Sequence, residues 1–287
     1  MRDVAYAAEL LRSGKLVAIP TETVYGLAAN ALDPDAVERI FKAKGRPFSS
    51  PLIVHVSDLA MARDLARDWS AVADKLAAKF WPGPLTIVVP KSDKVPDVVT
   101  AGLPSVALRM PAHPLALSVI AAAGIPLAAP SANRFTELSP TTAQHVRDSL
   151  GDAVDFVLDG GPCTVGIEST VISLAGPAPK ILRPGMISRT QIEAVIGPVE
   201  TGAGEESPGQ HPRHYSPRTR VVIGDAPREG HGVWLANMPN EAAAYAEQLY
   251  GRLHKLDSEG YDWIAIELPP NTAEWAGVRD RIIRAAT

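Results

Sequence analysis

The sequence of 287 residues contains a single cysteine, Cys163. One cysteine cannot close an intramolecular disulfide, and the seven histidines are too scattered to form a metal cage. We therefore expect no protein-bound metal. Lone cysteines are most often small buried apolar residues, and no particular histidine is placed to activate this one. We expect Cys163 to pack in the core and not to act as a nucleophile.

The sequence also lacks long apolar runs and an excess of basic charge. No run approaches the ~20 residues that span a bilayer, and the opening MRDVAYAAELLRSGK is typical of a short amphipathic helix and not of a signal peptide. We expect a cytoplasmic protein with no membrane partner. The formal net charge of -4 gives no general attraction for nucleic acid, so a polyanion site requires a local cluster of cations.

Several common catalytic motifs are absent as well. The chain has no G-x-x-x-x-G-K-[ST] phosphate loop, no G-x-G-x-x-G after a strand, no H-E-x-x-H and no G-x-S-x-G. These absences exclude the usual P-loop nucleotide sites, dinucleotide-binding loops, zinc proteases and serine hydrolases.

Short apolar segments alternate with helical patterns from residue 4 to about residue 196. The apolar segments, bounded by Gly or Pro, predict strands at 16–21, 52–56, 85–90, 106–110, 126–130, 156–160 and 169–174. The helical patterns predict helices at 33–45, 70–81, 114–124 and 140–151, the first beginning with Asp33 and Pro34 and ending at Gly45. The alternation predicts a mixed α/β (α+β) fold with a twisted sheet, whose strand order the pattern does not give.

The composition changes near residue 199, where PVETGAGEESPGQHPRHYSPRTR is rich in Gly, Pro, Ser and Glu and shows no hydrophobic period. We predict a first domain at 1–198, a linker at 199–219 and a small α/β domain at 220–287. In the small domain, strands are expected at 221–224, 233–237 and 263–268, with helices from Glu241 to about Leu256 and from about Ala273. Because about 70 residues is near the limit for independent folding, we expect this domain to dock on the first.

The stretch KAKGRPFSSP, residues 42–51, follows the helix predicted at 33–45. Arg39, Lys42, Lys44 and Arg46 occur between residues 39 and 57, a span without Asp or Glu. The stretch is either a phosphate-binding loop or a solvated helix end at which the helix dipole favours cations.

Polar side chains also follow several predicted strands, where ligands bind in α/β sheets. Each has a plain structural interpretation: His55 as a packed core residue, Ser131 and Asn133 as turn formers, and Arg183 as an ion-pair partner. The remaining members of the set are Thr21, Glu22, Thr23, Ser49, Ser50, Arg109, Ser139, Glu168 and Ser169. Taken alone, the residues indicate a two-domain α/β protein with a local anion site.

The joint arrangement of these residues resembles one family. IPTETVYGLAANA, KAKGRPFSSPLIVHV, FWPGPLT, VALRMPAHP, PLAAPSANRF and GIESTVI with ILRPG are similar, in order over about residues 5–200, to threonylcarbamoyl-AMP synthases with a YrdC-type domain. The linker SPGQHPRHYSP and the Rossmann-like C-terminal unit resemble the two-domain branch of that family, although the unit is shorter than usual. The resemblance implies a YrdC-like mixed sheet in the first domain.

The resemblance also implies a reaction and its site. The enzyme would be a nucleotidyltransferase that makes L-threonylcarbamoyladenylate and pyrophosphate from L-threonine, bicarbonate or carbon dioxide, and ATP, for threonylcarbamoyladenosine in tRNA. Lys44 and Arg46 would be the catalytic cations on the phosphates. The implied ATP site is Lys44, Arg46, Ser50, Ser105, Ser131, Asn133, Ser139, Arg183, His214 and Tyr215. The implied threonine site is Thr23, His55, Arg109, the backbone at Ala129, and Ser169.

Chemistry supports two of these implied roles. A guanidinium can bind a carboxylate bidentately, which suits Arg109 to the threonine carboxylate. Because no carboxylate cage is visible, Mg²⁺ would be carried by the ATP phosphates. Transient contact with tRNA, or with the complex that transfers the threonylcarbamoyl group, is a further expectation.

The linker segment HPRHYSP carries more cationic and aromatic groups than a passive tether needs. In two-domain members of the family the equivalent segment lies over the active site, so we predict that His214 or Tyr215 contacts the nucleotide or gates the cleft. The alternative is a surface linker whose tyrosine packs between the domains.

Two other functions stay open. The first is a module that binds tRNA or double-stranded RNA without catalysis, which the acidic composition and the lack of stacking aromatics near Lys44 disfavour. The second is a carbamoyl-transfer accessory acting on carbamoyl phosphate, because related domains occur in hydrogenase maturation proteins. Those proteins carry acylphosphatase and zinc-finger segments that this chain lacks.

Overall fold

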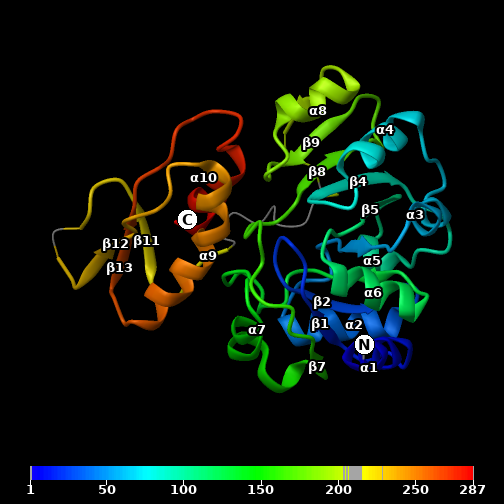
Figure 1. Ribbon diagram of the computed structural model, residues 1–287, viewed down its shortest axis with the longest axis horizontal. Coiled ribbons are helices and arrows are strands. Elements are labelled where there is room, and N and C mark those ends of the chain that lie inside the picture. The colour runs from blue at the N-terminus through cyan, green and yellow to red at the C-terminus, as the bar shows by residue number, and fades with distance from the viewer. Residues whose placement is uncertain (1, 203, 205, 207–214, 228, 287) are drawn as a thin grey trace.

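A computed structural model describes residues 2–202, 204, 206, 215–227 and 229–286 (Figure 1). Its larger part is built on a ten-stranded mixed sheet of order β10-β9-β8-β4-β5-β3-β6-β2-β1-β7. The strands are β1 (Val17–Ile19), β2 (Gly26–Asn30), β3 (Ile53–His55), β4 (Leu85–Pro90), β5 (Ser105–Arg109), β6 (Leu127–Ala128), β7 (Phe156–Val157), β8 (Thr170–Ser173), β9 (Lys180–Arg183) and β10 (Glu200–Thr201). The mixed α/β fold with a twisted mixed sheet is confirmed.

The helices of this part pack against the sheet and against one another, as α1 does with α6. They are α1 (Arg2–Arg12), α2 (Pro34–Lys44), α3 (Leu59–Leu65), α4 (Ala71–Phe80), α5 (Asp97–Thr100), α6 (Pro114–Ala123), α7 (Ala143–Leu150), α8 (Arg189–Ile196) and the 3₁₀ turn η1 (Gly151–Ala153). The start of α2 is fixed by Asp33, whose side chain accepts from Asp35 N and Ala36 N. It ends at Gly45, which adopts a left-handed φ of 62°.

Several observed elements were not predicted. Strand β2 was not predicted, because GLAAN has no β-branched or aromatic residue, yet it pairs with both β1 and β6. The short strand β9 and the seven-residue helix α3 were also missed. Residues 200–201, expected in the linker, pair with β9 as β10.

The C-terminal part is a smaller α/β unit. Strands β11 (Arg220–Ile223), β12 (Gly232–Trp234) and β13 (Trp263–Ile266) form a parallel sheet of order β11-β13-β12, accompanied by α9 (Ala242–Ser258) and α10 (Ala276–Ala285). Figure 1 shows α9 and α10 between this sheet and the larger part of the molecule. The two helices therefore carry the residues that can meet the first domain.

The two parts share a hydrophobic cluster. Val24, Ile167 and Tyr215 pack in it together with residues of α9 and α10, including Leu249 and Ile282. The expected docking of the small unit is thus confirmed. A separate, larger cluster fills the first domain and includes Cys163, whose thiol pKa is raised to about 12 by burial.

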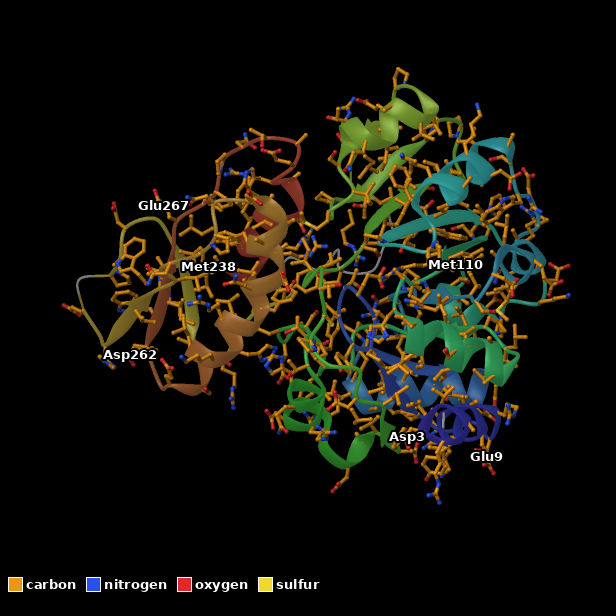
Figure 2. The ribbon with its side chains drawn as sticks, viewed as in Figure 1. Asp3, Glu9, Met110, Met238, Asp262 and Glu267 are labelled. Atoms are coloured by element: carbon orange, nitrogen blue, oxygen red, sulfur yellow. The ribbon has the colours of Figure 1, made fainter. Side chains whose placement is uncertain are left out.

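Both parts carry charged side chains on their outer surfaces. Figure 2 shows Asp3 and Glu9 on the outer side of α1, and Asp262 and Glu267 at the small sheet, and all four residues are exposed. In the part of the chain that the structure describes, no helix is long and apolar enough to cross a membrane.

Candidate active site

A pocket lies where strands of the large sheet end. Strands β3 and β5 run parallel with His55 opposite Arg109 in register, so both side chains leave the sheet at the same edge. The pocket is lined by Thr21, Thr23, Val24, Gly26, Arg46, Ile53, His55, Arg109, Ala129, Pro130, Ser131, Glu168, Ser169, Arg183 and Tyr215. It therefore brings together all five residues of the expected threonine site and four of the expected ATP site.

Arg46 enters this pocket from the loop after α2. Its side chain is buried and donates to Ser50 Oγ at 2.5 Å and to Pro51 O at 3.1 Å. The guanidinium carbon lies 5.7 Å from the centroid of the Phe135 ring. Its Nε has no hydrogen-bond partner among the described residues. Burial lowers the pKa of Arg46 to about 10, so the group stays charged at neutral pH. Arg46 is therefore a buried cation held by neutral oxygens.

Lys44 lies behind the pocket wall and not in it. Its Nζ donates to Ser131 O at 2.5 Å and to Asn133 O. Burial, followed by the charge of Arg46, lowers the pKa of the ammonium group. In this arrangement Lys44 fixes the turn that presents Ser131 to the pocket, and Asn133 Nδ2 holds the next turn through Arg134 O and Glu137 O.

Arg109 is oriented by a carboxylate that the sequence did not identify as its partner. Glu22 Oε1 lies 2.7 Å from Arg109 NH2, and Arg109 Nε donates to Gly83 O at 3.3 Å. Both side chains are nearly inaccessible to solvent, at 8% and 4% exposure. Glu22 follows a buried strand in the sequence, which was the available signal for a role in the site.

His55 is a neutral imidazole beside this pair. Burial, followed by the positive charge of Arg109, lowers the pKa of His55 to about 3. Its Nδ1 is buried and has no hydrogen-bond partner within the described chain. A neutral ring with an unsatisfied nitrogen can exchange a hydrogen bond with a ligand.

Arg183, Ser169 and Tyr215 form the opposite wall. Arg183 donates through Nε and NH2 to Ser169 O at 3.1 and 3.0 Å, and through NH1 to Tyr215 OH at 3.5 Å. Ser169 Oγ in turn lies 2.8 Å from Thr86 Oγ1. Tyr215 is 1% exposed and packs between the two parts of the molecule while also lining the pocket, so both interpretations of its role have support.

Four further residues of the expected ATP site do not line the pocket. Ser50 binds Arg46 from outside it, and Ser139 Oγ donates to Glu168. Asn133 lies in the turn held by Lys44, and Ser105 begins β5, about 13 Å along the strand from Arg109. His214 falls outside the residues that the structure describes.

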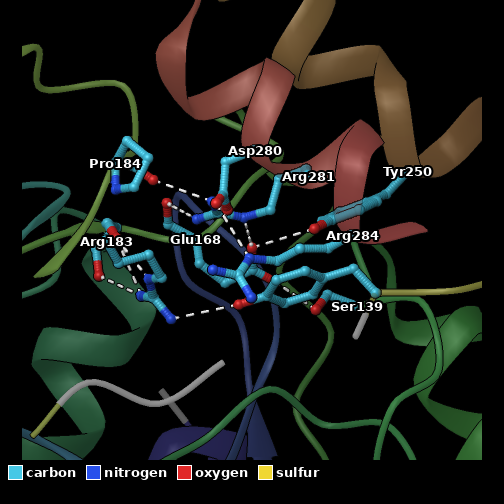
Figure 3. A network of polar contacts seen from close by, with 10 residues as sticks. Ser139, Glu168, Arg183, Pro184, Tyr250, Asp280, Arg281 and Arg284 are labelled. Atoms are coloured by element: carbon cyan, nitrogen blue, oxygen red, sulfur yellow. Dashed lines mark hydrogen bonds and ion pairs between the residues drawn. The ribbon is translucent and has the colours of Figure 1, made fainter. Parts of the chain in front are cut away.

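Glu168 is a carboxylate in the pocket wall whose partners the sequence did not reveal. Arg281 of α10 donates to Glu168 Oε2 at 2.7 Å, and Tyr250 of α9 donates to the same oxygen at 3.2 Å (Figure 3). Both partners come from the small C-terminal unit, more than 80 positions away. One carboxylate of the pocket wall is therefore held by the second part of the chain.

Comparison with known proteins gives matches over the whole chain. The Sua5/YciO/YrdC family model, described as "Telomere recombination", matches residues 9–185, and the model for the C-terminal domain of threonylcarbamoyl-AMP synthase matches residues 187–287. The threonylcarbamoyl-AMP synthase of Bacillus subtilis is 40% identical, over 99% of this chain and 93% of the relative. That of Pyrococcus abyssi is 47% identical, over 79% of this chain and 69% of the relative.

A solved structure supports the same assignment. The crystal structure of P. abyssi Sua5 complexed with L-threonine has a TM-score of 0.95 and 37% identity, covering 99% of this chain and 94% of that one. Sequence and fold thus agree along both parts of the molecule. The chain belongs to the threonylcarbamoyl-AMP synthase family, in the two-domain form that joins a YrdC-type domain to a C-terminal domain.

Proposed function

We propose that this protein condenses L-threonine, bicarbonate or carbon dioxide, and ATP into L-threonylcarbamoyladenylate and pyrophosphate, for threonylcarbamoyladenosine in tRNA. One observation carries the proposal. Three buried guanidinium groups, those of Arg46, Arg109 and Arg183, face one pocket in a chain whose relative was solved with L-threonine. Buried cations that face a pocket favour an anionic ligand such as a carboxylate or a triphosphate.

The threonine site is assigned to the Glu22 side of the pocket. Arg109, held in place by Glu22, would bind the threonine carboxylate. His55 would accept or donate a hydrogen bond at the substrate amine or hydroxyl, with Thr23 beside it. The Ala129 N–H already donates to Ile53 O, so the Ala129 carbonyl is the backbone group that can accept from the substrate.

The ATP site is assigned to the Arg46 side. Arg46 would bind the phosphates directly, with Ser50 and Ser131 as further donors, while Lys44 shapes the turn that carries Ser131. Arg183 and Tyr215 would contact the nucleotide from the opposite wall. We retain Ser105, Asn133, Ser139 and His214 as proposed members of the nucleotide site.

The reaction then needs positioning and charge neutralisation. The threonine amine, in its neutral form, attacks the carbon of carbon dioxide and loses a proton to solvent, which gives a carbamate. A carbamate oxygen then attacks the α-phosphorus of ATP. The bond from the α-phosphorus to the bridging oxygen breaks, and pyrophosphate leaves with that oxygen. Fixed guanidinium groups stabilise the charge that moves to the leaving phosphates, and no covalent intermediate on the protein is required.

Magnesium fits this pocket as a companion of the ATP phosphates. The one carboxylate that lines the pocket, Glu168, is paired with Arg281, and Glu22 behind the wall is paired with Arg109, so the described pocket offers no cluster of free carboxylates for a metal. We propose that the ion reaches the pocket with ATP, where it would neutralise phosphate charge.

The burial and pairing of the cations in residues 39–46 argue against the RNA-binding alternative. It requires an exposed basic patch, but Lys44 and Arg46 are only 3% and 6% exposed. Arg39 pairs with Asp155 at 3.0 Å, and Lys42 pairs with Glu38 at 3.2 Å. Of the four cations, Arg46 thus lines the buried pocket, Lys44 is buried behind it, and Arg39 and Lys42 form ordinary surface ion pairs.

Pyrophosphate release from ATP tests the proposed function. We expect release by the unmodified protein to require threonine and bicarbonate together. Arg46→Gln should lower kcat/KM for ATP by about 10- to 150-fold, because one charge-assisted contact is lost. Lys42→Gln, two residues before Lys44 and exposed, is the matched control and should leave the rate unchanged. Absence of release under all conditions from folded protein would refute the synthase assignment.

A further inference from the structure

Glu168 places a negative charge in the wall of a pocket assigned to an anionic nucleotide. The residue is 7% exposed and lines the pocket beside Ser169 and Arg183. Burial alone raises the pKa of this carboxyl, but the charges of Arg281 and Arg183 and the hydrogen bond from Ser139 outweigh that effect and lower it below the usual value. Glu168 is therefore ionised at neutral pH and needs a counter-ion.

Arg281 supplies that counter-ion from the C-terminal unit. Its side chain is fully buried, and it donates to Glu168 Oε2 at 2.7 Å and to Glu168 O at 3.2 Å (Figure 3). The same guanidinium donates to Pro184 O at 3.0 Å and to Asp280 at 2.6 Å. The guanidinium carbon of Arg281 also lies 5.1 Å from the centroid of the Tyr215 ring. Arg281 thus contacts Glu168, the loop after β9 and the pocket tyrosine at once.

The contacts of Glu168 lead to other parts of the proposed nucleotide site. Glu168 Oε1 accepts from Ser139, and the main chain of the next residue, Ser169, accepts two hydrogen bonds from Arg183. A displaced or unpaired Glu168 would therefore alter the position of these groups and the potential at the pocket together.

We propose that Arg281 is a positioning residue for ATP binding, because it cancels the charge of Glu168 and holds that carboxylate against Ser139. This inference rests on the proposed function for the identity of the ligand. It assigns the C-terminal unit a specific role: the unit delivers one cation that makes the pocket wall compatible with a triphosphate. If the Arg281–Glu168 ion pair had only a structural role, its loss would lower stability and weaken the binding of ATP and threonine alike.

The two ligands respond differently to an uncompensated Glu168. ATP carries several negative charges, whereas threonine is a zwitterion without net charge at neutral pH. Coulomb repulsion inside a protein is strong enough for one extra charge to weaken ATP binding by about tenfold or more. Threonine binding should change by less than about threefold.

The test compares three variants by the dissociation constants of ATP and of threonine from calorimetry, by pyrophosphate release and by melting temperature. In Arg281→Gln, Glu168 keeps its charge, so we expect ATP binding at least about tenfold weaker and threonine binding nearly unchanged. In the double variant Glu168→Gln/Arg281→Gln, both charges are absent, and ATP binding should return to within about threefold of the unmodified protein. Arg279→Gln is the matched control, because Arg279 lies on the same helix and donates to Pro269 inside the small unit.

Specific outcomes would overturn the inference. It fails if the double variant binds ATP as weakly as Arg281→Gln, if both ligands weaken together in proportion to a lower melting temperature, or if Arg281→Gln binds ATP normally. It also fails if the unmodified protein binds no ATP. If the unmodified protein binds ATP and the variants follow the expected order but no pyrophosphate is released, the charge role stands and the synthase assignment fails.

Discussion

Glu22 and Arg109 form an ion pair from which water is almost excluded, and Glu38 and Lys42 form one at the surface. The nitrogen-to-oxygen distances of the two pairs are similar, 2.7 and 3.2 Å, but the first pair is buried and the second is exposed. A buried charge that loses its partner cannot recover its hydration, whereas an exposed charge can. The contribution of an ion pair to the stability of this protein therefore depends on how deeply the pair is buried.

This difference gives a prediction for stability. Glu22→Ala leaves the Arg109 guanidinium buried without its carboxylate, so the free energy of unfolding should fall by about 3 to 5 kcal/mol. Glu38→Ala, the control, should cost less than about 1 kcal/mol. Urea unfolding of both variants measures the two values. Equal losses would show that the Glu22–Arg109 pair contributes no more than a surface contact.

Single residues were also the most predictable part of the site. Thr23, His55, Arg109 and Ser169 were expected from the family's motifs and do line one pocket. Their partners were not predictable in the same way, because a motif identifies a residue type and its position along the chain only. The assignment of Glu22 to Arg109 depends on how β1 and β5 lie in the folded sheet.

Helix α2 was predicted from its ends, and its C-terminal end matters for the site. Gly45 stands between Lys44 and Arg46 with a φ of 62°, and Gly124 ends α6 with a φ of 67°. A Cβ on either glycine would meet nothing within 4 Å. The cost of a substitution at either position is therefore backbone strain and not a clash.

These two glycines allow a matched comparison. Gly45→Ala and Gly124→Ala should each lower the free energy of unfolding by about 1 kcal/mol. Only Gly45→Ala should raise KM for ATP, because the strained turn carries Arg46 into the pocket. Urea unfolding and pyrophosphate release measure the two effects. A similar KM in both variants would mean that the turn at Gly45 does not position Arg46.

Elements without a strong local signal were missed. Strand β2, with the sequence GLAAN, has no β-branched or aromatic residue, and its place in the sheet is set by pairing with β1 and β6 and not by its own β propensity. Its first residue, Gly26, comes so close to Ala129 that an added Cβ would lie 3.2 Å from the alanine Cβ. This close approach, which favours a residue without a Cβ at position 26, exists only once the strands have paired and therefore leaves no local signal in the sequence.

At the scale of the whole molecule, the two parts meet at a stacked pair of histidines. His145 of α7 and His254 of α9 have ring centroids 3.9 Å apart and an interplanar angle of 21°. Burial, followed by the proximity of His254, lowers the pKa of His145 to about 4. Burial likewise lowers the pKa of His254, although its hydrogen bond to Ser139 O opposes that shift.

The lowered pKa of His145 predicts a pH dependence of stability. Between an unfolded pKa of about 6.5 and the folded value of about 4, the unfolded chain binds a proton that the folded protein does not. The free energy of unfolding should therefore fall as the pH drops through this range. His145→Phe should flatten the dependence, and the exposed His231→Phe should not. Urea unfolding at pH 7, 6 and 5 checks both, and identical slopes in all three proteins would contradict the assignment to His145.

Docking of the two parts was predictable, but its chemistry was not. The small size of the C-terminal unit predicted that it packs on the first domain. Arg281, however, stands 113 positions after Glu168, and no periodicity or motif links residues so far apart. The residues that join the parts could be identified only in the folded molecule.

The Glu168–Arg281 contact also has a consequence for the order of events during synthesis. A ribosome that adds roughly 5 to 20 residues per second needs roughly 6 to 23 seconds to pass from position 168 to position 281. During that interval the strands of the first domain can pair with one another, but Arg281 has not yet been synthesised and cannot pair with Glu168. The nascent protein can thus acquire its shape before it acquires the charge balance of its pocket.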